Sequence, residues 1–367
     1  MIPQIDLKRQ HQALRSELMD AAARVIDSCR FILGPEGQAL EREVGAVCGA
    51  RHGLGTGSGT DALLVALKAV GVKPGDEVIT SAFSFVASAT TIVMAGATPV
   101  FVDIDPGTFN VDPAQVEAAI TARTRAIVPV HLYGQIAAMD TLCELARARG
   151  LAVVADAAQA VGASYAGRPV AQWGDAATLS FYPTKNLGAC GDAGMVLTTR
   201  DDVAERVRLL RDHGQPRRYT HIELGGSSRL DELQAALLRV KVGRLPEWNQ
   251  RRRAIARHYG DVLAGLGLGL PVERAPAQHV YHQYTVRSGK RDALAAALAN
   301  RGIGTAIHYP ITIPAQPLFS YPNADRAFPV ATQAAAEVLS LPCFPELTDG
   351  EVEAVVAAVK QAVGEVM

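Results

Sequence analysis

The sequence predicts an α/β protein: a large domain built on a mostly parallel β-sheet, followed by a smaller C-terminal α+β domain. The first observation is that short Val- and Ile-rich runs alternate with helical patterns along the first 200 residues. Strands buried on both faces read as apolar runs, so this alternation is typical of a parallel sheet covered by helices. The second observation is a change after Arg200, where helical patterns dominate and a separate α+β pattern follows. With 367 residues, 49% of them hydrophobic, the chain can form two cores.

The first half of the chain predicts the elements of the sheet in order. Two helices are expected at 10–28 and 36–47, because Gly34-Pro35 interrupts the helical pattern between them. A glycine loop at 53–59 then leads into a helix at 60–70. Further strands are expected at 77–81, 98–103, 126–130, 152–155, 177–181 and 194–198, with helices at 85–94, 113–120 and 139–149.

The second half predicts mainly helices and then a short α+β unit. Helices are expected at 203–211, 230–242, 247–263, 290–301 and 349–363, and strands at 281–287 and 305–309. A Gly- and Pro-rich stretch at 265–276 separates the two patterns. We place the domain boundary on the long helix near residue 250, which gives a large domain over 1–249 and a small domain over 250–367.

Charge and cysteine content exclude several classes of protein. The 36 Lys and Arg residues balance 37 Asp and Glu residues, which argues against binding nucleic acid through phosphate neutralisation. Five scattered cysteines form neither a closed disulfide framework nor a spacing typical of zinc sites, so no metal is expected. Free thiols indicate a reducing compartment. The sequence therefore predicts a cytoplasmic protein.

A membrane location is not expected. The N-terminal stretch MIPQIDLKRQHQ is polar and lacks the apolar region of a signal peptide. The uncharged stretch 78–102 is long enough to span a bilayer, but it holds seven Ser and Thr residues together with Gly96 and Pro99. That composition favours a strand, a helix and a second strand in a soluble protein.

The glycine loop GLGTGSGTDALLVAL is the first candidate for a binding site. Its glycines remove side chains, Ser58 and Thr60 offer hydroxyl groups, and the following helix directs backbone N–H groups at the loop. An anion would gain hydrogen bonds and the favourable end of the helix dipole there. A dinucleotide fingerprint fails, because Thr60 replaces its last glycine and no acidic residue ends a second strand about 20 residues later. Taken alone, the loop fits a phosphate cup and a plain strand–helix turn equally well.

Two charged residues follow neighbouring predicted strands. Asp156 ends an apolar strand, where its carboxylate needs a cationic partner unless it caps a helix. Lys185 comes 29 residues later, after the next strand and a Pro turn, and glycines surround it. Because ligands of α/β proteins bind at the carboxyl edge of the sheet, both side chains can reach one crevice. A partly desolvated lysine has a lowered pKa and can form a Schiff base, whereas a lysine in a turn is ordinarily solvated.

The three features together match the needs of pyridoxal 5′-phosphate (PLP). Its phosphate needs a cup of hydroxyl and N–H groups, its ring nitrogen a carboxylate, and its aldehyde a lysine. The glycine loop, Asp156 and Lys185 occur in this order. Their coincidence points to PLP more strongly than any one of them.

The motifs resemble those of the DegT/DnrJ/EryC1/StrS aminotransferases. These are PLP enzymes of fold type I, the aspartate aminotransferase-like fold, and they aminate nucleotide-linked keto sugars. The resemblance covers essentially the whole chain. It is carried by the stretches IDLKRQ, ILGPE, GSGTDALLVAL, FSFVAS, DAAQAVGA, SFYPTKNLGACGDAG, RLDELQAALLRVK and IHYP.

The resemblance implies a role for each matching residue. Lys185 forms the Schiff base and moves the proton during transamination, and Asp156 pairs with the ring nitrogen of PLP. Gln159 lies near the 3-hydroxyl, and Phe85 stacks on the ring, although an isolated Phe would more often belong to the core. The implied phosphate ligands are Ser58, Gly59, Thr60 and Ser180, and the residues lining the hexose pocket are Tyr182, His308 and Tyr309. By itself, His308 would be a structural histidine at a strand end.

Two positions refine the resemblance. Related sugar dehydratases carry histidine at the position of Lys185, so the lysine indicates a transaminase. Many members place an asparagine before the RLDELQAA helix, where it reaches the phosphate in the neighbouring subunit; Ser227 stands here, with a shorter reach. The resemblance implies a homodimer with shared active sites, in which Arg229, His213 and Tyr219 are candidates for contacts to the partner's ligand.

The resemblance also implies a reaction. L-glutamate donates its amino group, pyridoxamine 5′-phosphate carries it, and a nucleotide-linked keto sugar accepts it. The stretches RDHGQPRRY, SSRLDELQAALLRVK and YHQYTVR resemble most the subgroup that aminates the 3-keto position of dTDP-linked 6-deoxyhexoses. The alternative substrates are a UDP-linked 3-keto acetamido sugar uronate and a 4-keto sugar nucleotide.

Two alternatives come from other classes. An NAD oxidoreductase lacks support because the second-strand acidic residue is missing. A protein that keeps PLP as a sensor or structural ligand would not need a proton-carrying lysine beside Asp156 and Gln159. Turnover distinguishes this alternative from a transaminase.

Overall fold

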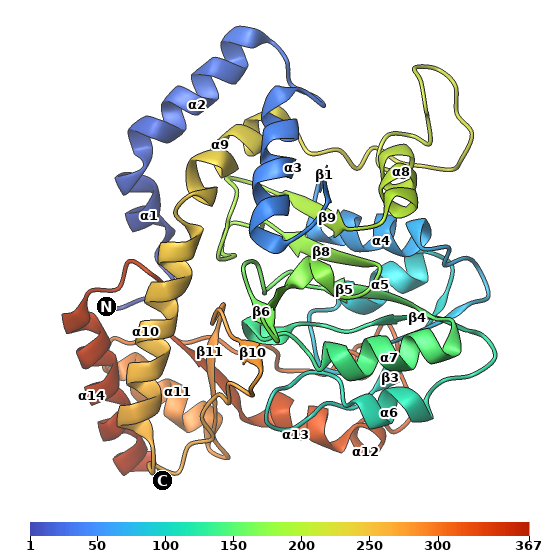
Figure 1. The fold of residues 1–367 in the computed structure, drawn as a ribbon. Helices are drawn as coiled ribbons and strands as arrows, with labels where there is room; N and C mark the ends of the chain where they lie inside the picture. The colour runs from blue at the N-terminus through green and yellow to red at the C-terminus, as the bar shows by residue number, and fades with distance from the viewer. Residues whose placement is uncertain (367) are drawn as a thin grey trace.

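A seven-stranded sheet forms the centre of the computed structural model, which describes residues 1–366 (Figure 1). The strand order is β1-β9-β8-β5-β4-β2-β3. Neighbours from β8 to β3 pair in parallel, whereas β9 is antiparallel to both β8 and β1, so the predicted mostly parallel sheet is confirmed. The strands are β1 (His52–Thr56), β2 (Glu77–Ser81), β3 (Thr98–Val102), β4 (Thr124–Val128), β5 (Ala152–Asp156), β8 (Ala176–Ser180) and β9 (Gly194–Thr198).

Helices cover both faces of this sheet. Successive residues of a strand point to opposite faces, so each buried strand contributes to a core on either side of the sheet. Ile127 and Val153 join one core, whereas the next residues, Val128 and Val154, join the other. The first core includes residues of α3 (Pro35–Cys48), α7 (Met139–Arg149) and α9 (Glu232–Val242). The second includes residues of α4 (Gly59–Ala69), α5 (Ala87–Met94) and α8 (Asp201–Leu210). The short helix α6 (Pro113–Ala118) packs beside α7.

The C-terminal part has a core of its own. Helices α10 (Leu245–Leu263), α11 (Arg291–Asn300) and α14 (Asp349–Val366) contribute to it, together with the antiparallel pair β11 (Tyr284–Arg287) and β12 (Val338–Leu341). Helices α12 (Ala324–Ala327) and α13 (Pro329–Glu337) precede β12. A second small sheet joins β6 (Ser164–Tyr165), β7 (Arg168–Pro169) and β10 (Ala277–Gln278). The boundary near residue 250 falls within α10 and stays a prediction.

The strand expected at 305–309 is wrong. Only Ala306 pairs with Ser340, as an isolated bridge beside β12. The carbonyl of His308 accepts a hydrogen bond from the Tyr133 hydroxyl, and Pro310 has no N–H to extend a ladder. The segment therefore leaves the sheet and crosses toward the site described below.

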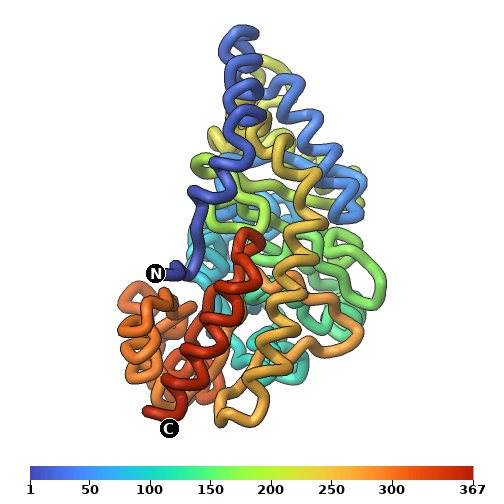
Figure 2. The backbone as a smooth tube through the Cα atoms, turned by 90° about the vertical axis from the view of Figure 1, so that its left-hand side faces the viewer, coloured from blue at the N-terminus to red at the C-terminus, as the bar shows by residue number. Residues whose placement is uncertain are grey.

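The N-terminal helices extend from the opposite end of the molecule to the C-terminal core (Figure 2). The single helix expected at 10–28 is divided at Leu14 into α1 (Leu7–Ala13) and α2 (Arg15–Ser28). Helix α2 packs on α9 through Ala21 and Val25, which contact Ala236.

The uncharged stretch 78–102 folds as β2, α5 and β3, with connections at 82–86 and 95–97. Within residues 1–366, no helix has the length and apolar composition needed to cross a membrane.

Candidate active site

The carboxyl ends of the parallel strands open into a cavity of about 530 Å³. Strand β5 brings Asp156 to its edge, β8 brings Ser180, and α4 directs its first turn at the same space. Eleven of the residues proposed from the sequence line this cavity: Ser58, Gly59, Thr60, Phe85, Asp156, Gln159, Ser180, Tyr182, Lys185, His308 and Tyr309. The fold therefore brings together residues that are up to 251 positions apart in the chain.

The glycine loop has the backbone geometry of an anion cup. A Cβ atom on Gly59 would lie 2.6 Å from the Cβ of Ser180, and one on Gly194 would lie 2.3 Å from the carbonyl oxygen of Ser58. Glycine is therefore required for these segments to approach so closely. The Ser58 hydroxyl oxygen accepts the Asp61 N–H at 3.0 Å and caps α4, and Gly59 and Thr60 of the first turn line the cavity. This helix end favours a negatively charged group such as phosphate.

Asp156 is almost fully buried, and its carboxylate has partners on both oxygens. The Ser88 hydroxyl donates to Oδ2 at 2.8 Å, and the Ala158 N–H donates to Oδ1 at 3.1 Å. Burial raises the pKa of the carboxyl group, whereas these two donors and the Lys185 charge lower it. No helix begins directly after Asp156, so its interpretation as a helix cap is wrong. A cationic ring nitrogen beside it would keep the carboxylate charged.

Lys185 lies in the turn after β8 and lines the same cavity. Burial lowers the pKa of its amine to about 8, against the opposing effect of the Asp156 charge. A substantial fraction of such an amine is neutral near physiological pH, and the neutral amine is the nucleophilic form. The interpretation of Lys185 as an ordinary solvated lysine is therefore not favoured.

The Gln159 amide is held in one orientation. Its Oε1 accepts the Tyr133 N–H at 2.6 Å, and its Nε2 donates to the Tyr309 hydroxyl at 3.2 Å. The amide nitrogen thus lies on the side of the cavity. A hydroxyl or phenolate oxygen placed there would find a hydrogen-bond donor.

Aromatic and imidazole side chains also line the cavity. Phe85 is 55% exposed, so the interpretation as a core residue is wrong, and its ring centroid lies 6.0 Å from that of Tyr309. An exposed ring inside a cavity offers a surface on which a planar ligand can stack. The Nδ1 of His308 lies 2.9 Å from the Ser340 hydroxyl, and burial lowers its pKa to about 4. His308 is therefore a neutral hydrogen-bonding group near pH 7.

Four residues proposed from the sequence do not line the cavity of their own chain: Ser227, Arg229, His213 and Tyr219. They belong to the segment between α8 and α9, which projects from the body (Figure 1). Arg229 contacts the Asp212 carboxylate at 2.6 Å and the Ser227 hydroxyl at 2.9 Å, and Tyr219 is 79% exposed. In the single chain, these four residues lie outside the lining of the cavity.

Several cavity residues were missed by the analysis of the sequence. Thr184, Asp192, His282 and Gln283 line the cavity, and Ser88 and Tyr133 hold Asp156 and Gln159. Thr184 and Asp192 flank Lys185 in a stretch already singled out, so their position gave a signal. Ser88 gave none, because a serine in an Ala- and Ser-rich helix has many structural explanations.

The residues present fit PLP. The glycine loop and the start of α4 can hold the phosphate of PLP. The buried Asp156 can pair with its ring nitrogen, and the exposed Phe85 can stack on its ring. Across residues 1–366, no group of three or more His, Cys, Asp or Glu residues is arranged to hold a metal ion.

Comparison with known proteins gives a consistent result. Residues 12–360 match the DegT/DnrJ/EryC1/StrS aminotransferase family. The chain is 49% identical to the "Pleiotropic regulatory protein" of Geobacillus stearothermophilus, with 98% of each chain covered. It is 45% identical to the UDP-N-acetyl-3-dehydro-α-D-glucosamine 3-aminotransferase of Acidithiobacillus ferrooxidans, covering 98% of this chain and 97% of that protein. It is also 45% identical to the dTDP-3-amino-3,4,6-trideoxy-α-D-glucose transaminase of Streptomyces venezuelae, covering 98% and 96%.

Solved structures agree with the fold and with the cofactor. DesV of S. venezuelae, in complex with a ketimine intermediate, superposes with a TM-score of 0.97 at 45% identity, covering 99% of this chain and 98% of that one. NtdA of Bacillus subtilis, with bound cofactor PMP, superposes with a TM-score of 0.93 at 30% identity, covering 99% and 85%.

Proposed function

Because the chain belongs to the DegT/DnrJ/EryC1/StrS aminotransferase family, we propose that it transfers an amino group from L-glutamate to the 3-keto position of a dTDP-linked 6-deoxyhexose. It is a PLP-dependent aminotransferase. One observation carries the proposal: Lys185, Asp156, Gln159 and the N-terminus of α4 meet in one cavity of about 530 Å³. The dTDP-sugar transaminase among the relatives supports this choice of substrate.

Each part of the cavity has a proposed task in holding the cofactor. Ser58, Gly59, Thr60 and Ser180 bind the phosphate at the helix end, where the dipole favours an anion. Asp156 binds the ring nitrogen, Gln159 the 3-hydroxyl through Nε2, and Phe85 the face of the ring. When bound, PLP supplies a carbonyl group that receives the amino group and a ring that withdraws electrons.

Lys185 is the nucleophile and the proton carrier. Its amine has a pKa of about 8, so the neutral Nζ would be available as a nucleophile and would accept or release a proton near physiological pH. Asp156 supplies a fixed negative charge, which its Ser88 and Ala158 donors stabilise. Gln159 orients the ring by a hydrogen bond from one side of the cavity.

The hexose is proposed to occupy the part of the cavity lined by Tyr182, His308 and Tyr309. Their hydroxyl and imidazole groups can bind sugar hydroxyls, and the neutral His308 adds no charge near the transferred proton. Arg229, His213, Tyr219 and Ser227 are proposed to reach the site from a second copy in a homodimer. We also propose that the enzyme works in the cytoplasm, consistent with five free cysteines.

Two other functions are supported by the names of relatives. The A. ferrooxidans protein is named for a UDP-linked 3-keto sugar, so amination of UDP-linked substrates is the second candidate. The name of the G. stearothermophilus protein points to regulation, which needs no turnover. The cavity contains a nucleophilic lysine beside a buried carboxylate, and this pair favours catalysis.

The test is a visible spectrum of the purified protein before and after L-glutamate, with Lys185→Ala as the control. We expect a cofactor absorption band that L-glutamate bleaches and a changed or missing band in the variant. A dTDP-linked 3-keto-6-deoxyhexose should then restore the band. Restoration by UDP-linked 3-keto sugars alone would move the assignment to the second candidate. A band unaffected by amino donors would contradict the transaminase proposal.

A further inference from the structure

The segment after β4 contains a turn with an uncommon backbone. Tyr133 has φ of +59°, in the left-handed region that bulky residues rarely adopt. Tyr133 is buried, and so are its neighbours Leu132 and Gly134. A residue keeps such a conformation where the surrounding structure holds it, and this occurs often at functional sites. The contacts that hold this turn therefore bear on the site.

Asn110 binds the turn on both sides of Tyr133. Its Nδ2 donates to the Gln135 carbonyl at 3.0 Å, and its Oδ1 accepts the Leu132 N–H at 3.0 Å. Asn110 is buried, so both hydrogen bonds are shielded from water. The ring of the preceding Phe109 also packs edge-on against Tyr133, with centroids 5.4 Å apart. One side chain thus brackets the left-handed residue.

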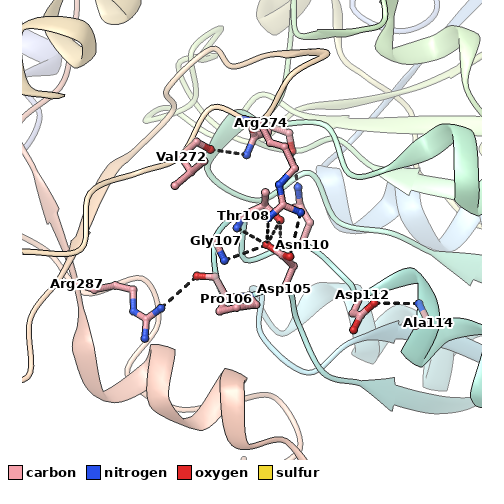
Figure 3. A network of polar contacts seen from close by, with 11 residues as sticks. Asp105, Pro106, Gly107, Thr108, Asn110, Asp112, Ala114, Val272, Arg274 and Arg287 are labelled. Carbon is pink, nitrogen blue, oxygen red and sulfur yellow. Dashed lines mark hydrogen bonds and ion pairs between the residues drawn. The ribbon is translucent and has the colours of Figure 1, made fainter. Parts of the chain in front are cut away.

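The loop that carries Asn110 is itself fixed (Figure 3). Asp105 Oδ1 accepts hydrogen bonds from the Gly107 and Thr108 N–H groups, and both Asp105 oxygens pair with Arg274 at 3.0 Å. The Asp105 N–H donates to the Asn110 carbonyl at 2.8 Å. These hydrogen bonds and the ion pair fix the loop and therefore the position of Asn110.

Tyr133, held in this turn, orients the Gln159 side chain. The Tyr133 N–H donates to Gln159 Oε1 at 2.6 Å, which leaves Nε2 on the cavity side near the Tyr309 hydroxyl. The Tyr133 hydroxyl donates to the His308 carbonyl and so holds the segment that carries Tyr309. If the turn relaxed, Gln159 would lose the contact that distinguishes its oxygen from its nitrogen. An amide presenting its oxygen would offer no hydrogen-bond donor to a phenolate oxygen of the cofactor.

We propose that Asn110 is a positioning residue for the cofactor: it holds the 132–135 turn so that the Tyr133 N–H fixes the Gln159 amide with Nε2 toward the ring. This inference rests on the proposed function only in taking PLP as the group that Gln159 faces. Asn110 itself does not line the cavity with Lys185 and Asp156. Asn110 acts through Tyr133 and Gln159.

A double-mutant cycle on the purified holoenzyme tests the inference. The variants are Asn110→Ala, Gln159→Ala and the pair, and the readouts are the dissociation constant of PLP and the wavelength of its absorption band. Asn110→Asp is a second variant that keeps the acceptor for the Leu132 N–H and loses the donor to Gln135. Asp103→Asn is the matched control, since Asp103 lies on the same loop but binds the Val330 and Ala331 N–H groups at the start of α13.

We expect Asn110→Ala and Gln159→Ala each to weaken PLP binding about tenfold and to shift the band. The pair should be no weaker than Gln159→Ala alone, because Asn110 acts through Gln159. Asp103→Asn should lower thermal stability without changing the dissociation constant or the band. Additive effects in the pair would overturn the inference, and so would an Asn110→Asp variant with wild-type PLP binding and spectrum. No sugar nucleotide is used, so a wrong sugar substrate would not alter these outcomes.

Discussion

Burial acts on Lys185 and Asp156 in the same sense: it favours the neutral form of each. The pKa of the lysine is lowered and that of the aspartate is raised, and each charge partly opposes the shift of the other. A cationic ring nitrogen beside Asp156 would add to the effect of the Lys185 charge and favour the carboxylate further.

The pKa of Lys185 predicts how fast apoenzyme takes up PLP. As the pH rises through about 8, the amine loses its proton and becomes nucleophilic. Below pH 8 the uptake rate should therefore rise about tenfold per pH unit and then level off. Stopped-flow absorbance between pH 6.5 and 9.5 measures this profile. A rate that keeps rising to pH 9.5 without levelling off would contradict the lowered pKa, and Lys185→Ala provides the baseline.

Ser88 offers a second prediction. Ser88→Ala removes the 2.8 Å hydrogen bond to Asp156 Oδ2, so the carboxylate is less stabilised as an anion. We expect bleaching of the cofactor band by L-glutamate to slow about tenfold, equivalent to about 1.4 kcal/mol.

The matched control for Ser88→Ala is Thr91→Ala. Thr91 is buried on the same helix, and its hydroxyl donates to the Ala87 carbonyl, away from Asp156. Its bleaching rate should stay within about twofold of the wild type. Equal slowing in both variants would mean that helix packing, and not the Asp156 contact, causes the effect.

The difference between Lys185 and Ser88 shows how far single residues could be predicted. Asp156 and Lys185 each had an ordinary structural explanation, and they became candidates because they occur in order with the glycine loop and match the family motifs. Ser88 and Asn110 act through short hydrogen bonds to residues 68 and 22 to 25 positions away. Only the folded chain brings such partners together.

At the scale of elements, helix α3 begins on a carboxylate from another helix. Glu232 of α9 accepts hydrogen bonds from the N–H groups of Gly34, Glu36 and Gly37 at 2.8–2.9 Å. Its side chain is buried, and a Cβ on Gly34 would lie 2.5 Å from Oε2. A charged acceptor from α9 thus takes the place of a local N-cap.

Glu232→Gln should therefore destabilise the protein. The amide keeps one acceptor oxygen but places an NH₂ group beside backbone donors, which should cost about 2 kcal/mol. Denaturant unfolding measures the free energy of unfolding. The control is Glu353→Gln, whose exposed carboxylate pairs with His258 at the surface and should change stability by less than about 0.5 kcal/mol. A Glu232→Gln variant as stable as this control would refute the capping role.

The elements themselves were predictable where periodicity and length agreed. The expected bounds of β2, β9 and α7 match the structure. The failures have physical causes. In the segment expected as a strand at 305–309, the His308 carbonyl accepts a hydrogen bond from the Tyr133 hydroxyl. Most of β1 was predicted as part of the glycine loop at 53–59, because two of its five residues are glycines. Strand β12 follows α13 directly, and its four residues are too few to show a period of their own.

At the scale of the whole molecule, the segment between α8 and α9 exposes large apolar side chains in the single chain. Tyr219, Ile222 and Leu224 are 79%, 66% and 85% exposed on the projecting segment between α8 and α9 (Figure 1). Exposed apolar side chains in sequence proximity are typical of a protein–protein interface. Arg229 lies at the end of the same segment and does not line its own cavity. The proposed dimer would cover the exposed apolar side chains of this segment and place Arg229 at the partner's cavity.

Hybrid dimers test whether the sites are shared. If Arg229 serves the partner's cavity, a hybrid of Lys185→Ala and Arg229→Ala subunits has both defects in one site and neither in the other. Hybrids purified through two different tags should then show about half the wild-type activity, although each parent dimer is impaired. If Arg229 serves its own cavity, each site of the hybrid carries one defect and activity stays at the level expected from the parents. Sedimentation on the same samples establishes that they are dimers, so a monomeric wild type would itself contradict the shared site.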